Sequence, residues 1–61
     1  MSPAKRKLRW RVLKGGHWLD FVEERREGEP VSYVGLIDGR EALRSGERRA
    51  AEVQLVLRVI G

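Results

Sequence analysis

The stretch KLRWRVLKGGHWLDFV, residues 7–22, decides the fold of this 61-residue chain. In its first half the apolar Leu8, Trp10 and Val12 alternate with cationic residues. A period of two is typical of a strand that buries one face. The glycine pair at 15–16 then interrupts the pattern, as a tight turn does. We therefore expect a strand that begins at residue 7 and ends at this turn.

Residues 17–27 (HWLDFVEERRE) fit two interpretations. A helix would gather four apolar side chains on one face: Trp18, Leu19, Phe21 and Val22. Gly28 would then end that helix. Against a helix, the acids late in the segment oppose the helix dipole, and a Gly-Gly turn between two apolar runs is typical of a hairpin. We favour a second strand, with a turn at 27–30, and keep the helix as the alternative.

Residues 31–37 (VSYVGLI) are rich in β-branched and aromatic side chains and predict a strand. Gly35 inside this segment indicates a bulge or a close approach of the backbone to another group. Asp38 and Glu41 have the spacing of a capping box, with Asp in place of the usual Ser or Thr. This spacing predicts a short helix over 39–45.

Residues 50–60 (AAEVQLVLRVI) give the clearest alternation in the chain and predict its last strand. One face of this strand would be apolar throughout and the other half apolar, as in a central strand or one pressed against a partner. The elements together predict an α+β, mostly β fold: a small twisted antiparallel sheet or open barrel of about four strands with one short helix. We expect residues 1–6 to be a disordered basic tail and residues 7–61 a single small domain.

A domain of this size buries only about 60% of the surface that its unfolded chain exposes, so it usually needs a staple. The chain has no Cys and one His, which excludes disulfides and argues against a structural zinc site. Self-association is the staple that remains. We therefore expect a homo-oligomer that holds no metal and no cofactor.

The composition also bears on location. No stretch approaches the roughly 20 apolar residues of a membrane span, and the basic N-terminus lacks the apolar core of a signal peptide. We therefore expect a cytoplasmic protein with no membrane contact. Arg outnumbers Lys ten to three, and Asn, Thr and Cys are absent. This composition is typical of proteins from hot environments, and a GC-rich genome also produces it.

The positive charge of the chain is concentrated at its N-terminus. Residues 1–16 hold six cationic side chains and no acid, whereas the rest of the chain is mildly acidic. A polyanion-binding segment needs such segregation, because phosphates respond to the local field. We therefore expect a protein that binds DNA or RNA with weak sequence preference. The residues expected to contact nucleic acid are Lys5, Arg6, Lys7, Arg9, Arg11 and Arg58.

The first strand is central to this expectation. Lys7, Arg9 and Arg11 would project from one face at intervals of about 6.6–6.8 Å, which suits contacts with successive phosphates. Arg58 would join them if its strand paired beside the first, and the tail would add a basic arm. The competing interpretation is a solvated cationic face that protects an edge strand from aggregation.

Two tryptophans and one histidine are the remaining candidates for a binding or catalytic role. Trp10 and Trp18 have the flat faces of a base-stacking platform, but in so small a domain we expect both in the core. His17 and Asp20 lie three residues apart and would share a face on a helix, where a His–carboxylate pair can act as a base and its orienting group. No nucleophile motif accompanies this pair, so we expect no enzymatic activity and no catalytic residue.

A second function comes from another class of protein. The chain also fits a small protein-interaction module, such as an inhibitor, adaptor or assembly subunit of viral or mobile-element origin. Residues 53–60 would then dock a protein partner by strand addition or by face-to-face packing. Salt separates the two hypotheses, because phosphate binding weakens steeply with salt and apolar docking does not.

Overall fold

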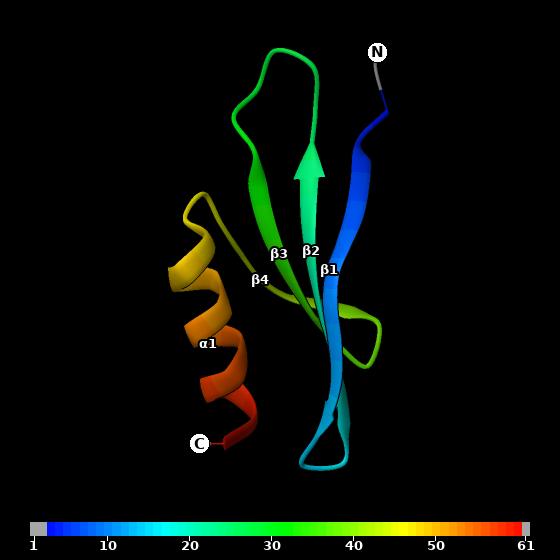
Figure 1. The fold of residues 1–61 in the computed structure, drawn as a ribbon, viewed down its shortest axis with the longest axis vertical. Helices are drawn as coiled ribbons and strands as arrows, with labels where there is room; N and C mark the ends of the chain where they lie inside the picture. Colours follow the sequence, from blue (N-terminus) through cyan, green and yellow to red (C-terminus); the bar gives the residue numbers. More distant parts are fainter. Residues whose placement is uncertain (1–2, 61) are drawn as a thin grey trace.

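Four antiparallel strands and one C-terminal helix make up the fold in the computed structural model, which describes residues 3–60 (Figure 1). The strands follow one another in the sheet in chain order, so each pairs with the next along the chain. The α+β, mostly β class is therefore confirmed. The elements are β1 (Lys5–Lys14), β2 (His17–Arg25), β3 (Ser32–Ile37), β4 (Arg40–Ser45) and α1 (Arg48–Ile60).

The hairpin expected around the glycine pair is confirmed, and the helix alternative for residues 17–27 is wrong. Gly15 and Gly16 have φ values of 59° and 80°, which a two-residue turn of the hairpin type requires at both positions. β1 and β2 pair directly across this turn. β1 begins at Lys5, so Lys5 and Arg6 of the expected tail lie in a strand, whereas residues 1–2 lie outside the described residues.

The short helix predicted over 39–45 is wrong, because this segment forms strand β4. Asp38 and Gly39 both have positive φ values, 52° and 83°. An Asp-Gly pair with this geometry makes a tight hairpin turn, so Asp38 starts a turn and caps no helix. The Asp38 carboxylate also accepts a hydrogen bond from the backbone N of Trp18, at 3.0 Å.

The strand predicted over 50–60 is also wrong, because these residues belong to α1. Ala51 and Leu55 are fully buried, and Val59, one turn further on, packs against the same core. This i, i+4, i+8 spacing is the inner face of a helix. A second apolar set is exposed on α1: Val53, Leu57 and Ile60, at 51%, 57% and 62%. Because the helix is apolar on two sides, its sequence also alternates like a strand.

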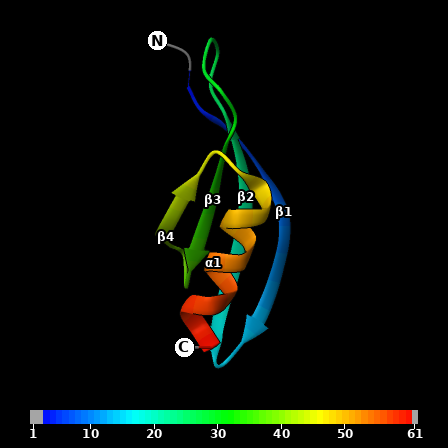
Figure 2. The same ribbon diagram turned by 90° about the vertical axis from the view of Figure 1, so that its left-hand side faces the viewer.

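α1 lies across one face of the sheet and packs against β4, β3 and β2 (Figure 2). The core between them consists of Leu19, Phe21, Leu43, Ala51 and Leu55. Gly35 lets α1 come this close, since a Cβ there would lie 2.9 Å from Leu55 Cδ1 and 3.1 Å from Leu43 Cγ. The close approach expected at this glycine is therefore confirmed. The register of β3 and β4 also shifts directly after it.

A bulge in β1 overturns the predicted faces of this strand. Leu8 pairs with Val22, but Trp10 pairs with Phe21, so the register shifts at Arg9. One extra residue moves the following side chains to the opposite face. Leu8 therefore lies on the sheet face away from α1, 49% exposed. The prediction that it shares a buried face with Trp10 and Val12 is wrong. Within residues 3–60, no helix has the length and apolar character needed to cross a membrane.

Candidate nucleic-acid interface

β1 forms one edge of the sheet, beyond the strands that α1 covers, and all its residues except Trp10 are exposed. Cross-strand partners share a face, so the register assigns each cation of β1 to a side. Lys7 pairs with Glu23, and Lys14 pairs with His17. On β2, Glu23 and His17 are each two residues from a buried core residue, Phe21 and Leu19, so they lie on the core side of the sheet. The cations on the α1 side of β1 are Lys5, Lys7 and Lys14, with Arg9 at the bulge.

Arg6 and Arg11 lie on the opposite face, and both are held by carboxylates of β2. Arg11 donates from Nε to Asp20 Oδ1 at 2.6 Å and from Nη2 to Asp20 Oδ2 at 3.1 Å. This two-point contact raises the pKa of Arg11 above its ordinary value. Arg6 Nε donates to Glu24 Oε2 at 2.8 Å. The predicted single row of Lys7, Arg9 and Arg11 is therefore split between two faces.

Glu24 is the centre of the ion pairs on that face. Its side chain is 2% exposed, and it accepts hydrogen bonds from Arg44 Nη1 at 2.6 Å and from Arg6. Arg26 Nε lies 3.6 Å from its Oε1. The hydrogen bonds from Arg44 and then Arg6 lower the pKa of Glu24 from 4.5 to about 2. This buried carboxylate therefore stays charged and satisfied by arginines from β1 and β4.

Arg9, the third arginine of the predicted set, lies 3.9 Å from Glu23. Glu23 also accepts a shorter hydrogen bond from Arg25 Nε, at 2.6 Å. That bond is the main cause of the lowered pKa of Glu23. All three arginines of β1 are thus paired with acids of the neighbouring strand, which the charge count of residues 1–16 alone did not reveal.

Lysines are the cations that the fold leaves available on β1. Lys5, Lys7 and Lys14 are exposed, and none forms an ion pair within residues 3–60. Lys14 was not among the residues predicted to contact nucleic acid, but its position and exposure group it with Lys5 and Lys7. Arg58 lies in the last turn of α1. The strand that was expected to bring it beside β1 does not exist.

An aromatic row crosses the same side of the sheet as these lysines. The rings of Trp10 and Phe21 stack with centroids 5.4 Å apart, and those of Phe21 and Tyr33 with centroids 5.8 Å apart. Phe21 is fully buried, whereas Trp10 and Tyr33 are half-buried at the two ends. Trp10 therefore packs against the core as expected. Trp18 does not, since it is 50% exposed.

His17 does not pair with Asp20. On a strand, residues three apart point to opposite faces, and His17 Nδ1 instead lies 2.6 Å from Asp38 Oδ2. This contact joins the β1–β2 turn to the β3–β4 turn and is the main cause of the lowered pKa of Asp38. In the part of the chain that the structure describes, no group of three or more His, Cys, Asp or Glu residues is placed to hold a metal ion.

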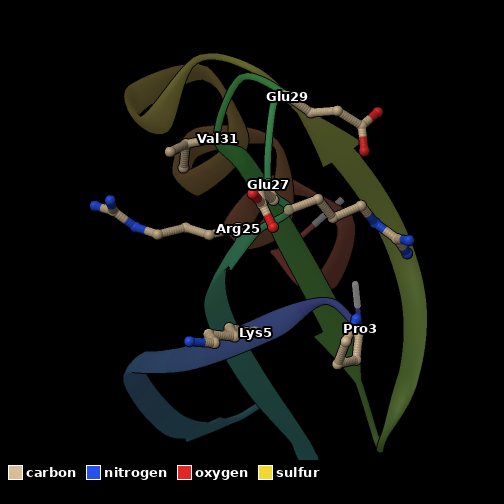
Figure 3. Close-up of a pocket in the computed structure, with 7 residues that line it drawn as sticks. Pro3, Lys5, Arg25, Glu27, Glu29 and Val31 are labelled. Carbon is tan, nitrogen blue, oxygen red and sulfur yellow. The ribbon is translucent and has the colours of Figure 1, made fainter. Parts of the chain in front are cut away.

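A pocket of about 550 Å³ opens at the N-terminal end of β1 (Figure 3). Lys5 and its cross-strand partner Arg25 direct their side chains to the same side of it. Glu27 and Glu29 of the β2–β3 loop also line this pocket. Because both cationic and acidic side chains line it, the pocket is not an anion site by itself. Lys5, the first lysine of β1, lies at this pocket.

Comparison of the chain with protein-family models, with curated proteins and with solved structures gave no match.

Proposed function

We propose that this chain binds nucleic acid through its phosphates, along the α1 side of β1, with weak sequence preference. The observation that carries the proposal is the set Lys5, Lys7 and Lys14, called here the lysine row. These residues share one face of an exposed edge strand and form no ion pair within residues 3–60. Lys7 also contributes, after Arg25 and Arg9, to the lowered pKa of its cross-strand neighbour Glu23, whose hydrogen bond comes from Arg25. Ammonium groups that no carboxylate holds in an ion pair can exchange counterions for phosphates.

The arginines of β1 are expected to contribute less than the lysine row. A phosphate that takes Arg11 from Asp20 would leave an 8% exposed residue with an unpaired carboxylate, and an unsatisfied buried acceptor is costly. The same holds for Arg6 and Glu24. These pairs instead hold β1 against β2 and so position the lysine row.

The spacing of the row suits a polyanion. Lys5 and Lys7 lie two residues apart on a strand, or about 6.6–6.8 Å, and β1 extends for about 33 Å over its ten residues. A backbone of several nucleotides therefore fits along it. The half-buried Trp10 lies between Lys7 and Lys14 on the same face and offers an aromatic edge beside the track. The proposal includes a cytoplasmic location and assigns no catalysis.

The test is fluorescence anisotropy with labelled single- and double-stranded DNA and RNA, at two or more salt concentrations. We expect binding that weakens steeply with salt. Each lost phosphate contact lowers the slope of log K against log salt by about 0.7–0.9, so Lys5→Ala, Lys7→Ala and Lys14→Ala together should lower it by about 2–3.

The matched control is Arg40→Ala. Arg40 is an exposed cation of β4 with no ion pair within residues 3–60, so its loss changes net charge as Lys7→Ala does. We expect Lys7→Ala to lower the slope of log K against log salt by about 0.7–0.9, the value of one phosphate contact, and Arg40→Ala to leave it unchanged. Equal effects of the two variants, or no binding of the wild type at low salt, would show that the proposal is wrong.

One observation favours the second candidate, a protein-interaction module. Residues 53–60 lie on α1, which rules out strand addition through this segment as the structure has it. The apolar side chains at Val53, Leu57 and Ile60 are nevertheless exposed. Docking by face-to-face packing is therefore the form of this hypothesis that the fold supports.

A further inference from the structure

The outward side of α1 carries an apolar stripe that nothing in the described chain covers. It consists of Val53, Val56, Leu57 and Ile60, called here the outer stripe, of which Val56 is half-buried and the others exposed. Their spacing is i, i+3, i+4 and i+7, which places them on one helix face. At 100° per residue this face lies nearly opposite the inner set of Ala51, Leu55 and Val59.

The outer stripe has the relief of a helix-packing surface. A shallow hollow of about 310 Å³ lies between the side chains of Glu52, Val53, Val56 and Leu57. These residues belong to two neighbouring i, i+4 rows of α1, and the groove between such rows receives the ridge of another helix. A second α1 supplies a ridge of matching composition. The one cation inside the segment, Arg58, lies on another side of the helix.

We propose that this chain forms a homodimer in which the outer stripes of two α1 helices pack against each other, antiparallel, around a two-fold axis near Val56 and Leu57. Such an interface uses the same patch on both copies. Val53 of one copy then lies beside Ile60 of the other. The four apolar residues of the outer stripe in one copy pack against the same four residues in the other copy.

The charge at the ends of the stripe fits this arrangement. Arg49 lies one turn before Val53 on the same side of α1 and forms no ion pair within residues 3–60. In the antiparallel pair its backbone lies one turn, or about 6 Å, beyond Ile60 of the other helix, at the end to which the last carbonyls point. The carbonyls of a last turn carry partial negative charge that a cation stabilises. A parallel pair would instead bring the two Arg49 side chains together.

The size of the domain gives a reason for such a dimer, since a domain of about 60 residues buries only about 60% of the surface of its unfolded chain and is marginally stable alone. In the dimer each sheet lies on the outer side of its own helix, and β1 stays uncovered. The proposal therefore does not rest on nucleic-acid binding, and its test contains no nucleic acid.

The test is sedimentation equilibrium of the full chain over a range of concentrations. We expect the wild type to show twice the 7.0 kDa chain mass. Leu57→Glu should raise the dissociation constant at least about 100-fold, because it buries two like charges at the axis. Gln54→Glu adds the same charge to an exposed position outside the stripe and should leave the mass unchanged.

Mixing provides a second measurement. Leu57→Glu and Leu57→Lys should each be monomeric alone and should form a heterodimer together, because position 57 of one copy faces the axis beside position 57 of the other. Circular dichroism reports whether each variant is folded, and restoration on mixing decides the question even if both unfold alone. A monomeric wild type, a dimer that survives Leu57→Glu, equal losses in the two Glu variants, or no restoration on mixing would each overturn the proposal.

Discussion

At the residue scale, Gly35 sets how closely α1 approaches the sheet. We expect Gly35→Ala to destabilise the protein by about 1–3 kcal/mol, as overpacking of a filled core does. The reason is that the new Cβ would lie 2.9 Å from Leu55 Cδ1 and 3.1 Å from Leu43 Cγ, both buried side chains. The measurement is urea unfolding followed by tryptophan fluorescence.

Gly46→Ala is the matched control for this substitution. Nothing lies within 4 Å of a Cβ at Gly46, and its φ is not in the left-handed region. Its stability should therefore stay within about 0.5 kcal/mol of the wild type. A Gly35→Ala variant as stable as Gly46→Ala would mean that α1 can move away from β3 at no cost.

At the scale of the element, one buried side chain anchors α1 to the sheet. Leu55 is fully buried between Gly35, Leu43 and the rest of the core. We expect Leu55→Ala to cost about 2–5 kcal/mol, from lost burial and from the cavity left behind. In a domain of marginal stability this loss should move the midpoint of unfolding close to zero denaturant concentration. Urea unfolding followed by circular dichroism at a helix wavelength measures it.

Gln54→Ala serves as the comparison within the same turn of α1. Gln54 is exposed, and Ala is at least as good a helix former, so stability should change by no more than about 0.5 kcal/mol. Equal losses in the two variants would show that burial of Leu55 against the sheet is not what stabilises α1.

At the scale of the whole molecule, acidic pH should unfold the protein through its ion pairs. Hydrogen bonds from arginines lower the pKa of Glu23, Glu24 and Glu41. Hydrogen bonds from His17 and from the backbone of Trp18 lower the pKa of Asp38. A carboxyl group whose pKa is lower in the folded than in the unfolded state stabilises the fold above its ordinary pKa. For Glu24 that contribution is complete above about 4.5 and is lost as pH falls toward about 2. The melting temperature should therefore fall over this window.

Glu24→Gln tests which carboxylate dominates this dependence. The variant should melt at a lower temperature at neutral pH, because Arg6 and Arg44 lose their charged partner. Its melting temperature should then change less between about pH 5 and pH 2 than that of the wild type. Glu29→Gln, at an exposed loop residue with no ion pair within residues 3–60, should keep the wild-type profile. A wild-type profile in Glu24→Gln would contradict the central role of this network.

Some of these contacts were within reach of the sequence. Once residues 15–16 are read as a two-residue turn, counting outward from it pairs Arg11 with Asp20, as the structure does. The same counting fails for Arg6 and Arg9, because the bulge at Arg9 shifts the register by one residue. The Asp38-Gly39 pair was also a hairpin signal, which the capping-box spacing of Asp38 and Glu41 obscured.

The sequence by itself indicated the class of fold and favoured the first hairpin over a helix, but it did not separate strand from helix over residues 39–45 and 50–60. Alternation before a Gly-Gly pair is a local signal, since strand period and turn conformation depend on neighbouring residues. It also determined that the cations gather at the N-terminal strand. These features survive in the structure as β1, its turn and β2.

Only the tertiary structure decided between helix and strand for residues 50–60, because a helix that is apolar on two sides alternates like a strand. The sheet decides the outcome, since Gly35 leaves room for Leu55 above a face that needs covering. The structure likewise decided which cations remain available. The acids that hold Arg6, Arg9 and Arg11 come from β2, and pairing between strands, not charge along the chain, determines which lysines are left for a partner.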